Sequence, residues 1–440
     1  MKIDRNQLLT VLSEALDSIE KEVLGVTDYH AKRVAWLCIQ MGKKAGMSEA
    51  ELSDLAISAL FHDNALNEFK QDYANGKLLE GATGQKHCIV GEENLKLISK
   101  EREQLRGFIL YHHENADGSG AFGKTTEEVP LGAQLIHIAD IVDLEFALGK
   151  AKKGDEKEIS LYIQSEKGRM FSEQAVELFS EVLSVQIFEI LSDTCIQTLQ
   201  LDFTTVWIEA DRGIAELFAR IIDYKSPFTK NHSIGVAQKA EYLAKCYGYD
   251  ELHTEKLYMA GALHDIGKLL VDVEVLEKAG RLNEEEYQHI QNHAYETYRL
   301  LSKISGFEEI RDWASYHHEK LNGKGYPFGV MEQEMSQEVR ILACIDIYQA
   351  LTEDRPYKVG MHHTKAISIL EELVQKGELD GNIVECIKRE FNDGNDIQKV
   401  EKTALFQCSI CGYIYEGDAV PYSYVCPVCG QLQHGFYRIE

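Results

Sequence analysis

The chain has 440 residues, of which 44% are hydrophobic, and its formal net charge is −26. That length can form several domains with cores of their own, whereas the excess of acidic residues argues against a broad basic face for duplex nucleic acid. No apolar run reaches the roughly 18 to 20 residues of a membrane span, and the first residues lack the apolar segment of a secretion signal. We therefore expect a cytoplasmic protein that binds neither duplex nucleic acid nor a membrane.

Helices are predicted for most of the chain. Only six prolines occur, and the stretches between them repeat apolar residues at helical spacing, as at Leu257, Ala260 and Gly261. Alternating β-branched residues are scarce before residue 405. We predict a mainly α protein with two helical bundles and a small β-rich tail. The predicted boundaries are 1–200 for the first bundle, 201–224 for a helical connector, 225–395 for the second bundle and 405–440 for the tail.

The first bundle contains five histidines and two aspartates with an informative spacing. Two pairs are adjacent in the chain, His62 with Asp63 and His112 with His113. Neighbouring side chains on a helix point about 100° apart, so adjacent ligands can address two different metal ions. The set comprises His30, His62, Asp63, His87, His112, His113 and Asp140.

The second bundle repeats this set in the same order, with corresponding residues separated by 202 to 206 positions. Chance does not repeat such a series, so the chain is an internal duplication in which each copy carries the ligands of a two-metal site. A carboxylate can bridge two cations through its two oxygens, which a histidine cannot do. The second set comprises His232, His264, Asp265, His293, His317, His318 and Asp346.

A single histidine in an apolar stretch is more often an ordinary core or surface residue than a metal ligand. That interpretation fails for the two sets, because they hold ten of the sixteen histidines. We treat the other six as ordinary residues. They are His137, His253, His289, His362, His363 and His434.

The second set is embedded in further motifs. His264-Asp265-Ile266-Gly267-Lys268 is followed by His317-His318-Glu319 with Gly325-Tyr326-Pro327, and then by Asp346 with Arg355-Pro356-Tyr357-Lys358. Over about residues 225 to 375 the chain resembles the HD-GYP domain, a subgroup of the HD metal-dependent phosphohydrolases. Members of that family hydrolyse cyclic di-GMP to pGpG or GMP.

The resemblance implies a role for each matching residue. The seven residues of the second set would hold two divalent metals, iron or manganese, with Asp265 bridging them. Lys268 would contact the scissile phosphate and act with Asp265 as the catalytic pair. Arg355, Lys358, Tyr326 and Lys320 would hold the rest of a cyclic dinucleotide substrate.

General chemical principles support hydrolysis of a phosphodiester at such a site independently of the family resemblance. Two cations lower the pKa of a bridging water toward neutrality and neutralise the phosphodiester. Lys268 and Arg355 can stabilise the charge that builds on the phosphoryl oxygens.

Three positions depart from the family pattern. Asn322 replaces the usual aspartate, and Thr297 replaces a glycine that follows the third histidine by four residues. Phe228 stands where some members have a carboxylate that holds a third metal. We therefore expect two metals rather than three.

The first repeat keeps its seven candidate ligands but loses the surrounding motifs. Leu66 stands where the second repeat has Lys268, and Gly120-Ala121-Phe122 replaces Gly-Tyr-Pro. Nothing after Asp140 resembles Arg-Pro-Tyr-Lys. Three interpretations remain open: a structural or regulatory metal domain, a second enzyme of different specificity, and an empty scaffold.

The tail carries two Cys-x-x-Cys pairs within 22 residues, Cys408 with Cys411 and Cys426 with Cys429. Four thiolates at this spacing form a tetrahedral cage for one metal ion. The segment resembles the rubredoxin-like knuckle of rubrerythrins, which favours redox-active iron, with a structural zinc ribbon as the alternative. We expect reduced core thiols at the other cysteines, which are Cys38, Cys88, Cys195, Cys246, Cys344 and Cys386.

We thus predict a cyclic di-GMP phosphodiesterase with an accessory redox domain, an electron-transfer partner for that domain, and a homodimer. One alternative is an HD-type di-iron oxygenase supplied with electrons by the tail, although Lys268, Arg355 and Lys358 argue against it because a neutral substrate needs no phosphate clamp. The other alternative is a nucleotide or redox sensor with little turnover.

Overall fold

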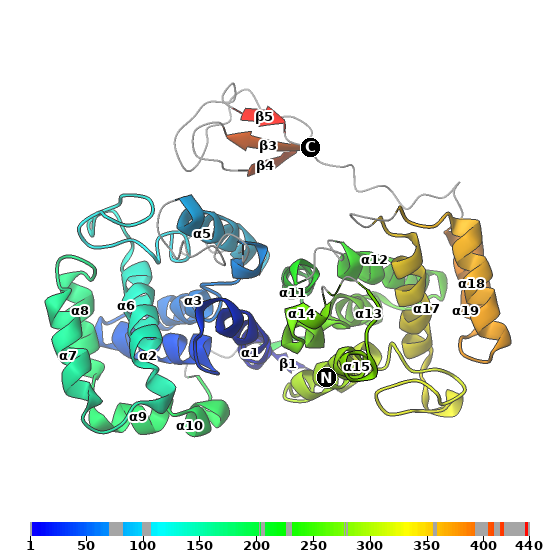
Figure 1. Cartoon of the computed structure of the whole chain (residues 1–440), viewed down its shortest axis with the longest axis horizontal. Helices are drawn as coiled ribbons and strands as arrows, with labels where there is room; N and C mark the ends of the chain where they lie inside the picture. Colours follow the sequence, from blue (N-terminus) through cyan, green and yellow to red (C-terminus); the bar gives the residue numbers. More distant parts are fainter. Residues whose placement is uncertain are drawn as a thin grey trace.

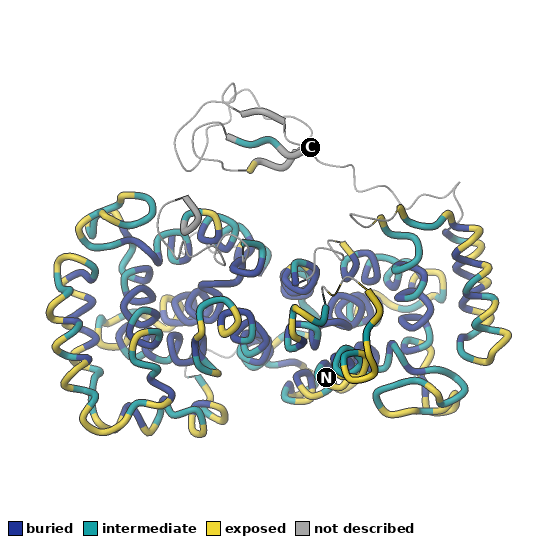
Figure 2. Tube along the Cα trace, in the orientation of Figure 1, coloured by how far each residue is buried: buried dark blue, intermediate teal, exposed yellow. Residues whose placement is uncertain are grey.

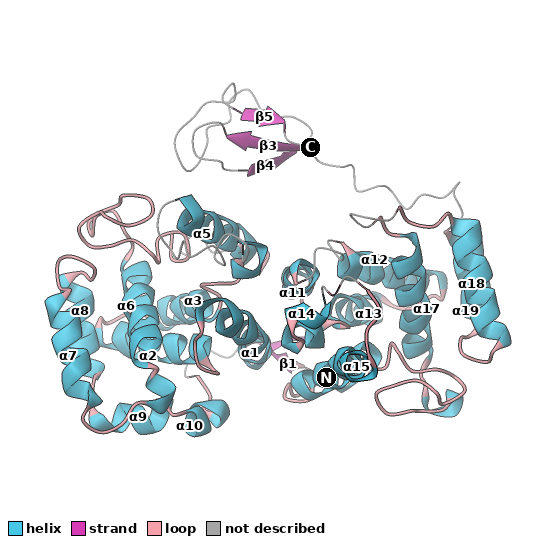
Figure 3. Ribbon diagram, viewed as in Figure 1, coloured by secondary structure: helices cyan, strands magenta, loops and turns pink. Residues whose placement is uncertain are grey.

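A computed structural model shows two helical bundles and a small β-sheet domain (Figures 1 and 3). This confirms the predicted fold class. The structure describes residues 2–69, 82–98, 107–201, 203, 207–225, 231–276, 278, 280–354, 359–391, 404–408, 414–417 and 436–438. Within these ranges, no helix combines the length and the apolar character needed to cross a membrane.

The first bundle, repeat one, carries its candidate ligands on three helices and on two turns between helices. The helices of this bundle are α1 (Arg5–Leu24), α2 (His30–Lys44), α3 (Glu49–Leu60), α5 (Ala82–Leu95), α6 (Leu131–Phe146), α7 (Asp155–Ser165), α8 (Glu173–Val182), α9 (Val185–Leu191) and α10 (Asp193–Thr198). Short 3-10 helices lie at η1 (Leu66–Phe69) and η3 (Leu148–Lys150).

The second bundle, repeat two, follows the same plan. Its helices are α11 (Arg212–Tyr224), α12 (His232–Cys246), α13 (Glu251–Leu263), α14 (Val273–Leu276), α15 (Glu284–Leu301), α16 (Glu308–Ser315), α17 (Gln337–Thr352), α18 (His363–Gln375) and α19 (Gly381–Glu390). The 3-10 helices are η4 (Ile266–Leu270) and η5 (Glu332–Glu334). The predicted helical connector thus contains α11, but its first part includes the short strand β2 (Trp207–Ile208).

Local sequence fixes where the helices begin. Ser48 and Glu51 form a reciprocal capping box before α3, and Asn283 and Glu286 do the same before α15. Such boxes satisfy two of the backbone N–H groups that a helix start leaves without partners. Asp211 caps α11 by accepting a hydrogen bond from the backbone N–H of Ile214.

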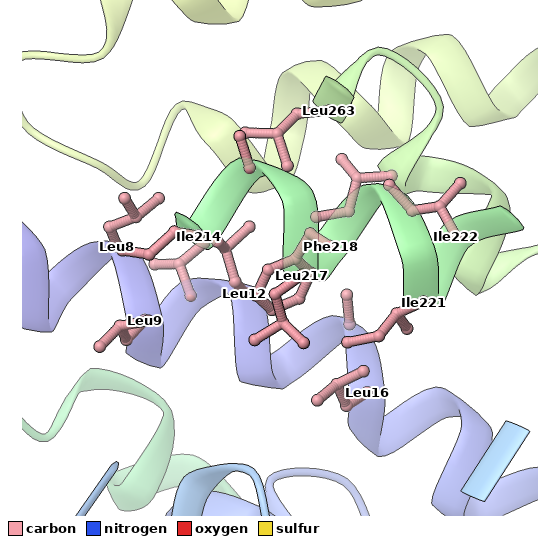
Figure 4. Packing of buried hydrophobic residues seen from close by; sticks show 14 of the residues in the cluster. Leu8, Leu9, Leu12, Leu16, Ile214, Leu217, Phe218, Ile221, Ile222 and Leu263 are labelled. Atoms are coloured by element: carbon pink, nitrogen blue, oxygen red, sulfur yellow. The ribbon is translucent and has the colours of Figure 1, made fainter. Parts of the chain in front are cut away.

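The two bundles share one buried core around α1 and α11. Figure 4 shows leucines of α1 packed against Leu217, Phe218 and Ile221 of α11. Each helix also contacts the other repeat, because α1 packs on η4 and α11 packs on η1. The buried segments in Figure 2 run through this central region. The strand β1 (Ile3–Asp4) pairs with β2 and so ties the beginning of the chain to the connector.

The tail forms a three-stranded antiparallel sheet in the order β4 (Ile414–Gly417), β3 (Ala404–Cys408) and β5 (Phe436–Arg438). Cys408 ends β3. Cys411, Cys426 and Cys429 lie outside the described residues, as does the side chain of Cys408.

The prediction of core thiols holds for Cys38, Cys88, Cys344 and Cys386, which are buried, but it is wrong for Cys195 and Cys246. Those two lie on the solvent faces of α10 and α12.

Candidate metal centres

All seven candidate ligands of repeat two converge in the structure. His232 begins α12, and His264 and Asp265 follow the last turn of α13. His293 lies in α15, the His317–His318 pair follows α16, and Asp346 lies in α17. Five helices, or the turns that directly follow them, therefore contribute to one cluster.

The two aspartates hold the centre of this cluster. Asp265 turns Oδ1 toward Nε2 of His293 (3.2 Å) and of His317 (3.8 Å). Its Oδ2 lies 3.3 Å from Nε2 of His264 and 4.0 Å from that of His232. Because each oxygen faces a different pair of imidazoles, the carboxylate has the geometry of a bridge between two cations. Asp346 Oδ1 lies 3.0 Å from His232 Nε2, which adds a carboxylate to one of the two groups.

The orientations of four histidine rings are fixed by contacts at Nδ1, on the side of each ring away from the cluster. Nδ1 of His264, His293 and His317 each lies 2.6 to 2.7 Å from the carbonyl oxygen three residues earlier. If Nδ1 donates that bond, the lone pair of Nε2 points into the cluster, as in metal-binding histidines. His232 is held by Glu353, whose Oε2 lies 3.2 Å from its Nδ1.

A metal pair fits these residues. His264 Nε2 and Asp265 Oδ1 are buried and have no hydrogen-bond partner, and such groups are costly unless a ligand satisfies them. Histidine nitrogens and carboxylate oxygens within 4.8 Å of one another form several groups that can hold an ion, including His232 with His264 and Asp346. Imidazole and carboxylate ligands suit iron and related divalent ions.

Repeat one also assembles its seven candidate ligands. Asp63 Oδ1 lies 3.4 Å from His87 Nε2 and 3.5 Å from His112 Nε2, while its Oδ2 lies 3.8 Å from His62 Nε2. Asp140 Oδ1 lies 3.2 Å from His30 Nε2. The distances match those of repeat two, so this repeat retains the bridging arrangement and not merely the residues.

The surroundings of the two clusters differ. A cavity of about 250 Å³ adjoins the repeat-two cluster, and its lining includes His318, Lys320, Lys324 and Tyr326. In repeat one, His113 corresponds to His318, and it is buried, with 7% of its surface exposed. The cavity there has about 10 Å³, which is room for about one water molecule. Among the residues that the structure describes, the cavity beside the repeat-two cluster is therefore the larger of these two.

Comparison with known proteins agrees with this architecture. Residues 27–145 and 216–383 each match the HD domain, and residues 406–436 match the rubredoxin-like domain of rubrerythrin. The 3′3′-cGAMP-specific phosphodiesterase 1 of Vibrio cholerae is 30% identical over 402 residues, which cover 88% of this chain and 92% of the relative. The chain belongs to the HD-domain phosphodiesterases.

Two further relatives define how far the similarity extends. The 3′3′-cGAMP-specific phosphodiesterase 3 of the same species is 26% identical and is covered over 94% of its length. A cyclic di-GMP phosphodiesterase of Pseudomonas aeruginosa is 34% identical over only 33% of this chain. The crystal structure of a cyclic GMP-AMP-specific phosphodiesterase of V. cholerae shares the fold, with a TM-score of 0.61 at 24% identity over 88% of this chain and 98% of that one.

In this phosphodiesterase the buried charges of repeat two stabilise one another. Burial alone would raise the pKa of Asp265, but His264 and Lys268 lower it well below its usual value. Burial lowers the pKa of His317 well below its usual value. An anionic aspartate and a neutral imidazole are the forms that ligate metal.

Of the other predicted site residues, three lie beside the cluster or its cavity and two lie outside the described residues. Lys268 lies beside the cluster, with Nζ 2.5 Å from Asp265 Oδ2. Tyr326 packs against the His318 ring with a centroid distance of 4.7 Å. Lys320 lines the cavity and forms an ion pair with Glu378 at 2.6 Å. Arg355 and Lys358 lie outside the described residues.

The sequence did not predict the supporting roles of two residues of repeat two. Glu319 accepts backbone hydrogen bonds from Phe328 and Gly329, at 2.7 and 3.0 Å, and thereby shapes the loop that carries Tyr326. Thr297 accepts a bond from the amide of Gly267 and donates one to the carbonyl of His264. The threonine that replaces the family glycine therefore adds two hydrogen bonds to the turn that carries Asp265 and Lys268.

Two residues of repeat one were also missed. Glu20, which is 1% exposed, has no hydrogen-bond partner at Oε2. His137, which we treated as ordinary, is buried with neither ring nitrogen hydrogen-bonded. Its ring lines the small cavity of repeat one, where a water molecule can satisfy it. The sequence contains no second copy of either residue, so the repeat comparison could not reveal them.

Proposed function

We propose that repeat two hydrolyses a cyclic dinucleotide with a hydroxide activated by two divalent metals, iron or manganese. The observation that carries this proposal is the pairing of a bridging carboxylate with an open, lysine-lined cavity in repeat two. The relatives that align over almost their full length are named as 3′3′-cGAMP-specific phosphodiesterases, and shorter matches are named as cyclic di-GMP phosphodiesterases. We therefore place both compounds in the substrate class.

The roles of the chain's own residues follow from their positions. A bound metal pair supplies hydroxide at neutral pH and polarises the phosphodiester. Asp265 holds both positions together, since its oxygens face different histidines. Lys268 lies close enough to offset charge on a phosphoryl oxygen. Tyr326, Lys320 and Lys324 line the space for the remainder of the dinucleotide, and Arg355 and Lys358 complete the proposed substrate set.

An assay of product formation tests the proposal. Metal-replete protein is incubated with 3′3′-cGAMP or cyclic di-GMP, and linear dinucleotides and mononucleotides are separated by chromatography. Metal-dependent hydrolysis with and without oxygen is expected. Consumption of neither compound by fully loaded protein would contradict the proposal. The oxygenase alternative is not favoured, because the relatives are phosphodiesterases.

For the tail we propose one iron held by Cys408, Cys411, Cys426 and Cys429, which exchanges electrons with a partner protein and reports redox state to repeat two. The match to the rubredoxin-like domain of rubrerythrin supports iron. The double variant Cys408→Ser with Cys411→Ser should lose the red charge-transfer colour and become insensitive to reductant, while repeat two keeps its metals. A colourless wild-type tail that contains zinc after growth in iron-rich medium would instead establish a structural zinc site.

The assembly and boundaries remain part of the proposal. We place the domains at 1–200, 201–224, 225–395 and 405–440, and mapping the stable fragments from limited proteolysis would test these boundaries. We also propose a homodimer in the cytoplasm, which light scattering of the full chain would test.

A further inference from the structure

A buried cysteine lies against the repeat-one cluster. Cys88 follows the candidate ligand His87 in α5 and is fully buried. Its Sγ lies 3.4 Å from Nε2 of His87 and 3.8 Å from Nδ1 of His112. One ligand atom from each of Cys88, His87, His112 and His113 lies within 4.8 Å of the other three. The sulfur is therefore a member of a group of metal-binding atoms and not only of the apolar core.

Repeat two has no thiol at this place. Ala294, which is also fully buried, follows His293 where Cys88 follows His87. The three matching histidines of repeat two form a group of their own, which comprises His293, His317 and His318. Both repeats thus share three histidines on this side of the cluster, and the sulfur is an addition of repeat one.

The distances around the sulfur fit a bound ion. Zinc lies about 2.3 Å from a thiolate and about 2.0 to 2.1 Å from a histidine nitrogen, so a tetrahedral site separates sulfur from nitrogen by about 3.6 Å. The 3.4 Å between Cys88 Sγ and His87 Nε2 agrees with this separation. Asp63 Oδ1 lies 3.4 Å from Nε2 of His87 and 3.5 Å from that of His112, so an ion among these atoms also meets the bridging carboxylate.

Several atoms around the sulfur are buried without a hydrogen-bond partner. They are Nε2 of His112, Nε2 of His113 and both carboxylate oxygens of Asp63. Nδ1 of His112 lies 2.6 Å from a backbone carbonyl oxygen, so Nε2 faces the cluster when Nδ1 donates that bond. Such unsatisfied atoms are costly. A hydrogen bond from the thiol to one imidazole would leave them unsatisfied, whereas a cation among them removes the cost.

We propose that Cys88 is a metal ligand, and that its thiolate joins His87, His112 and His113 in holding a structural zinc ion in repeat one. A thiolate selects soft ions such as zinc, whereas carboxylate and water ligands suit manganese. Structural zinc sites are filled by protein ligands, and catalytic ones keep a position open. The sulfur fills a position for which repeat two, with Ala294, supplies no side-chain ligand. Repeat one is then a structural metal domain and not a second enzyme.

Cobalt substitution tests for the metal–sulfur bond directly. The parent protein is the full chain with Cys408→Ser, Cys411→Ser, Cys426→Ser and Cys429→Ser, so that the tail contributes no thiolate. It is stripped of metal and titrated with Co²⁺ without oxygen. A cobalt–thiolate bond gives a charge-transfer band in the near ultraviolet, which imidazole and carboxylate ligands do not give. The parent should show this band, and added Zn²⁺ should displace the cobalt and remove it.

Cys88→Ala in this parent should lose the band. The change introduces the residue that repeat two carries at the same position, so the bundle should still fold. Cys386→Ala is the matched control, because it removes another buried thiol, in α19 of repeat two, and it should keep the band. A parent without the band, or a Cys88→Ala variant that retains it, would overturn the proposal.

Zinc binding and thermal unfolding separate a ligand from a packing residue. For these measurements the parent also carries His264→Ala and Asp265→Ala, so that the response to zinc comes from repeat one. Cys88→Ala should weaken zinc binding by about 10- to 100-fold or more, since even residues behind the ligands contribute that much. Zn²⁺ should also raise the unfolding temperature of the parent more than that of the variant. Equal affinities and equal shifts would show that Cys88 serves packing alone.

X-ray absorption gives a test that requires no change at Cys88. The zinc-loaded parent, in which the tail cysteines are serines, should show zinc–sulfur scattering at about 2.3 Å. Scattering from nitrogen and oxygen alone would refute the ligand role of Cys88, even if repeat one holds zinc.

Discussion

Replacing Lys268 by alanine provides the sharpest test of the repeat-two chemistry. Its Nζ lies 2.5 Å from Asp265 Oδ2, and its side chain is 25% exposed. A unit charge about 4 Å from a phosphoryl oxygen contributes about 4 kcal/mol at an effective dielectric constant of about 20. Solvent at the rim reduces this value, and removal of one stabilising group of this kind typically costs about 2.7 to 4 kcal/mol. We therefore expect kcat to fall by about 10² to 10³.

The metal content decides what a loss of activity means. An ammonium is not a ligand, so Lys268→Ala should keep the full complement of metal, and removing a positive charge beside Asp265 favours cation binding. Lys256→Ala is the matched control, because Lys256 pairs with Glu309 in the same repeat at 2.8 Å and lies outside the cluster. Steady-state kinetics and metal analysis on both variants are the assays. Turnover at the wild-type rate in Lys268→Ala would refute the role.

Two further predictions compare the repeats and the turn between the ligands. His264→Ala with Asp265→Ala should abolish hydrolysis, whereas His62→Ala with Asp63→Ala should leave much of it; loss of activity in a folded repeat-one variant would contradict the assignment of catalysis to repeat two. Thr297→Val keeps the shape but leaves a buried amide without its acceptor, so the free energy of unfolding should fall by about 1 to 3 kcal/mol. Denaturant titration measures this change, and an unchanged midpoint would show that the hydroxyl contributes nothing.

The sequence identified the candidate ligands, which the structure brings together, because their spacing occurs twice. His264 and Asp265 are recognisable beside each other, and their counterparts in repeat one confirm that the spacing is not accidental. Supporting residues give no such signal. Glu353 holds His232 from 121 positions away, and this contact exists only after α12 and α17 have packed together. Glu319 was visible in the His-His-Glu motif, but its role as an acceptor for the loop amides required the folded turn.

Glycines in that turn illustrate why part of a motif survives in both repeats. A Cβ on Gly325 would lie 2.4 Å from Glu319 Cα, and one on Gly120 would lie 2.6 Å from Glu114 Cα. Neither separation is sterically allowed, so packing of the loop on the His-His-Glu segment demands glycine in each copy. The tyrosine and proline that follow Gly325 are absent from repeat one, which has Ala121 and Phe122 instead. The glycine shared by both repeats therefore indicates that the two loops follow the same backbone path. Tyr326, in contrast, lines the cavity that adjoins the repeat-two cluster.

The reciprocal packing of α1 and α11 makes each repeat a structural support of the other. Each helix opens one repeat and covers the turn after the His-Asp pair of the other. Removal of repeat one would expose Leu217, Phe218 and Ile221 together with part of η4, and each such side chain contributes about 1.5 to 3 kcal/mol when fully buried. That loss approaches the whole stability of about 5 to 15 kcal/mol that typical domains have. Repeat one has Leu66 where repeat two has Lys268, but its helix α1 forms part of the core of repeat two.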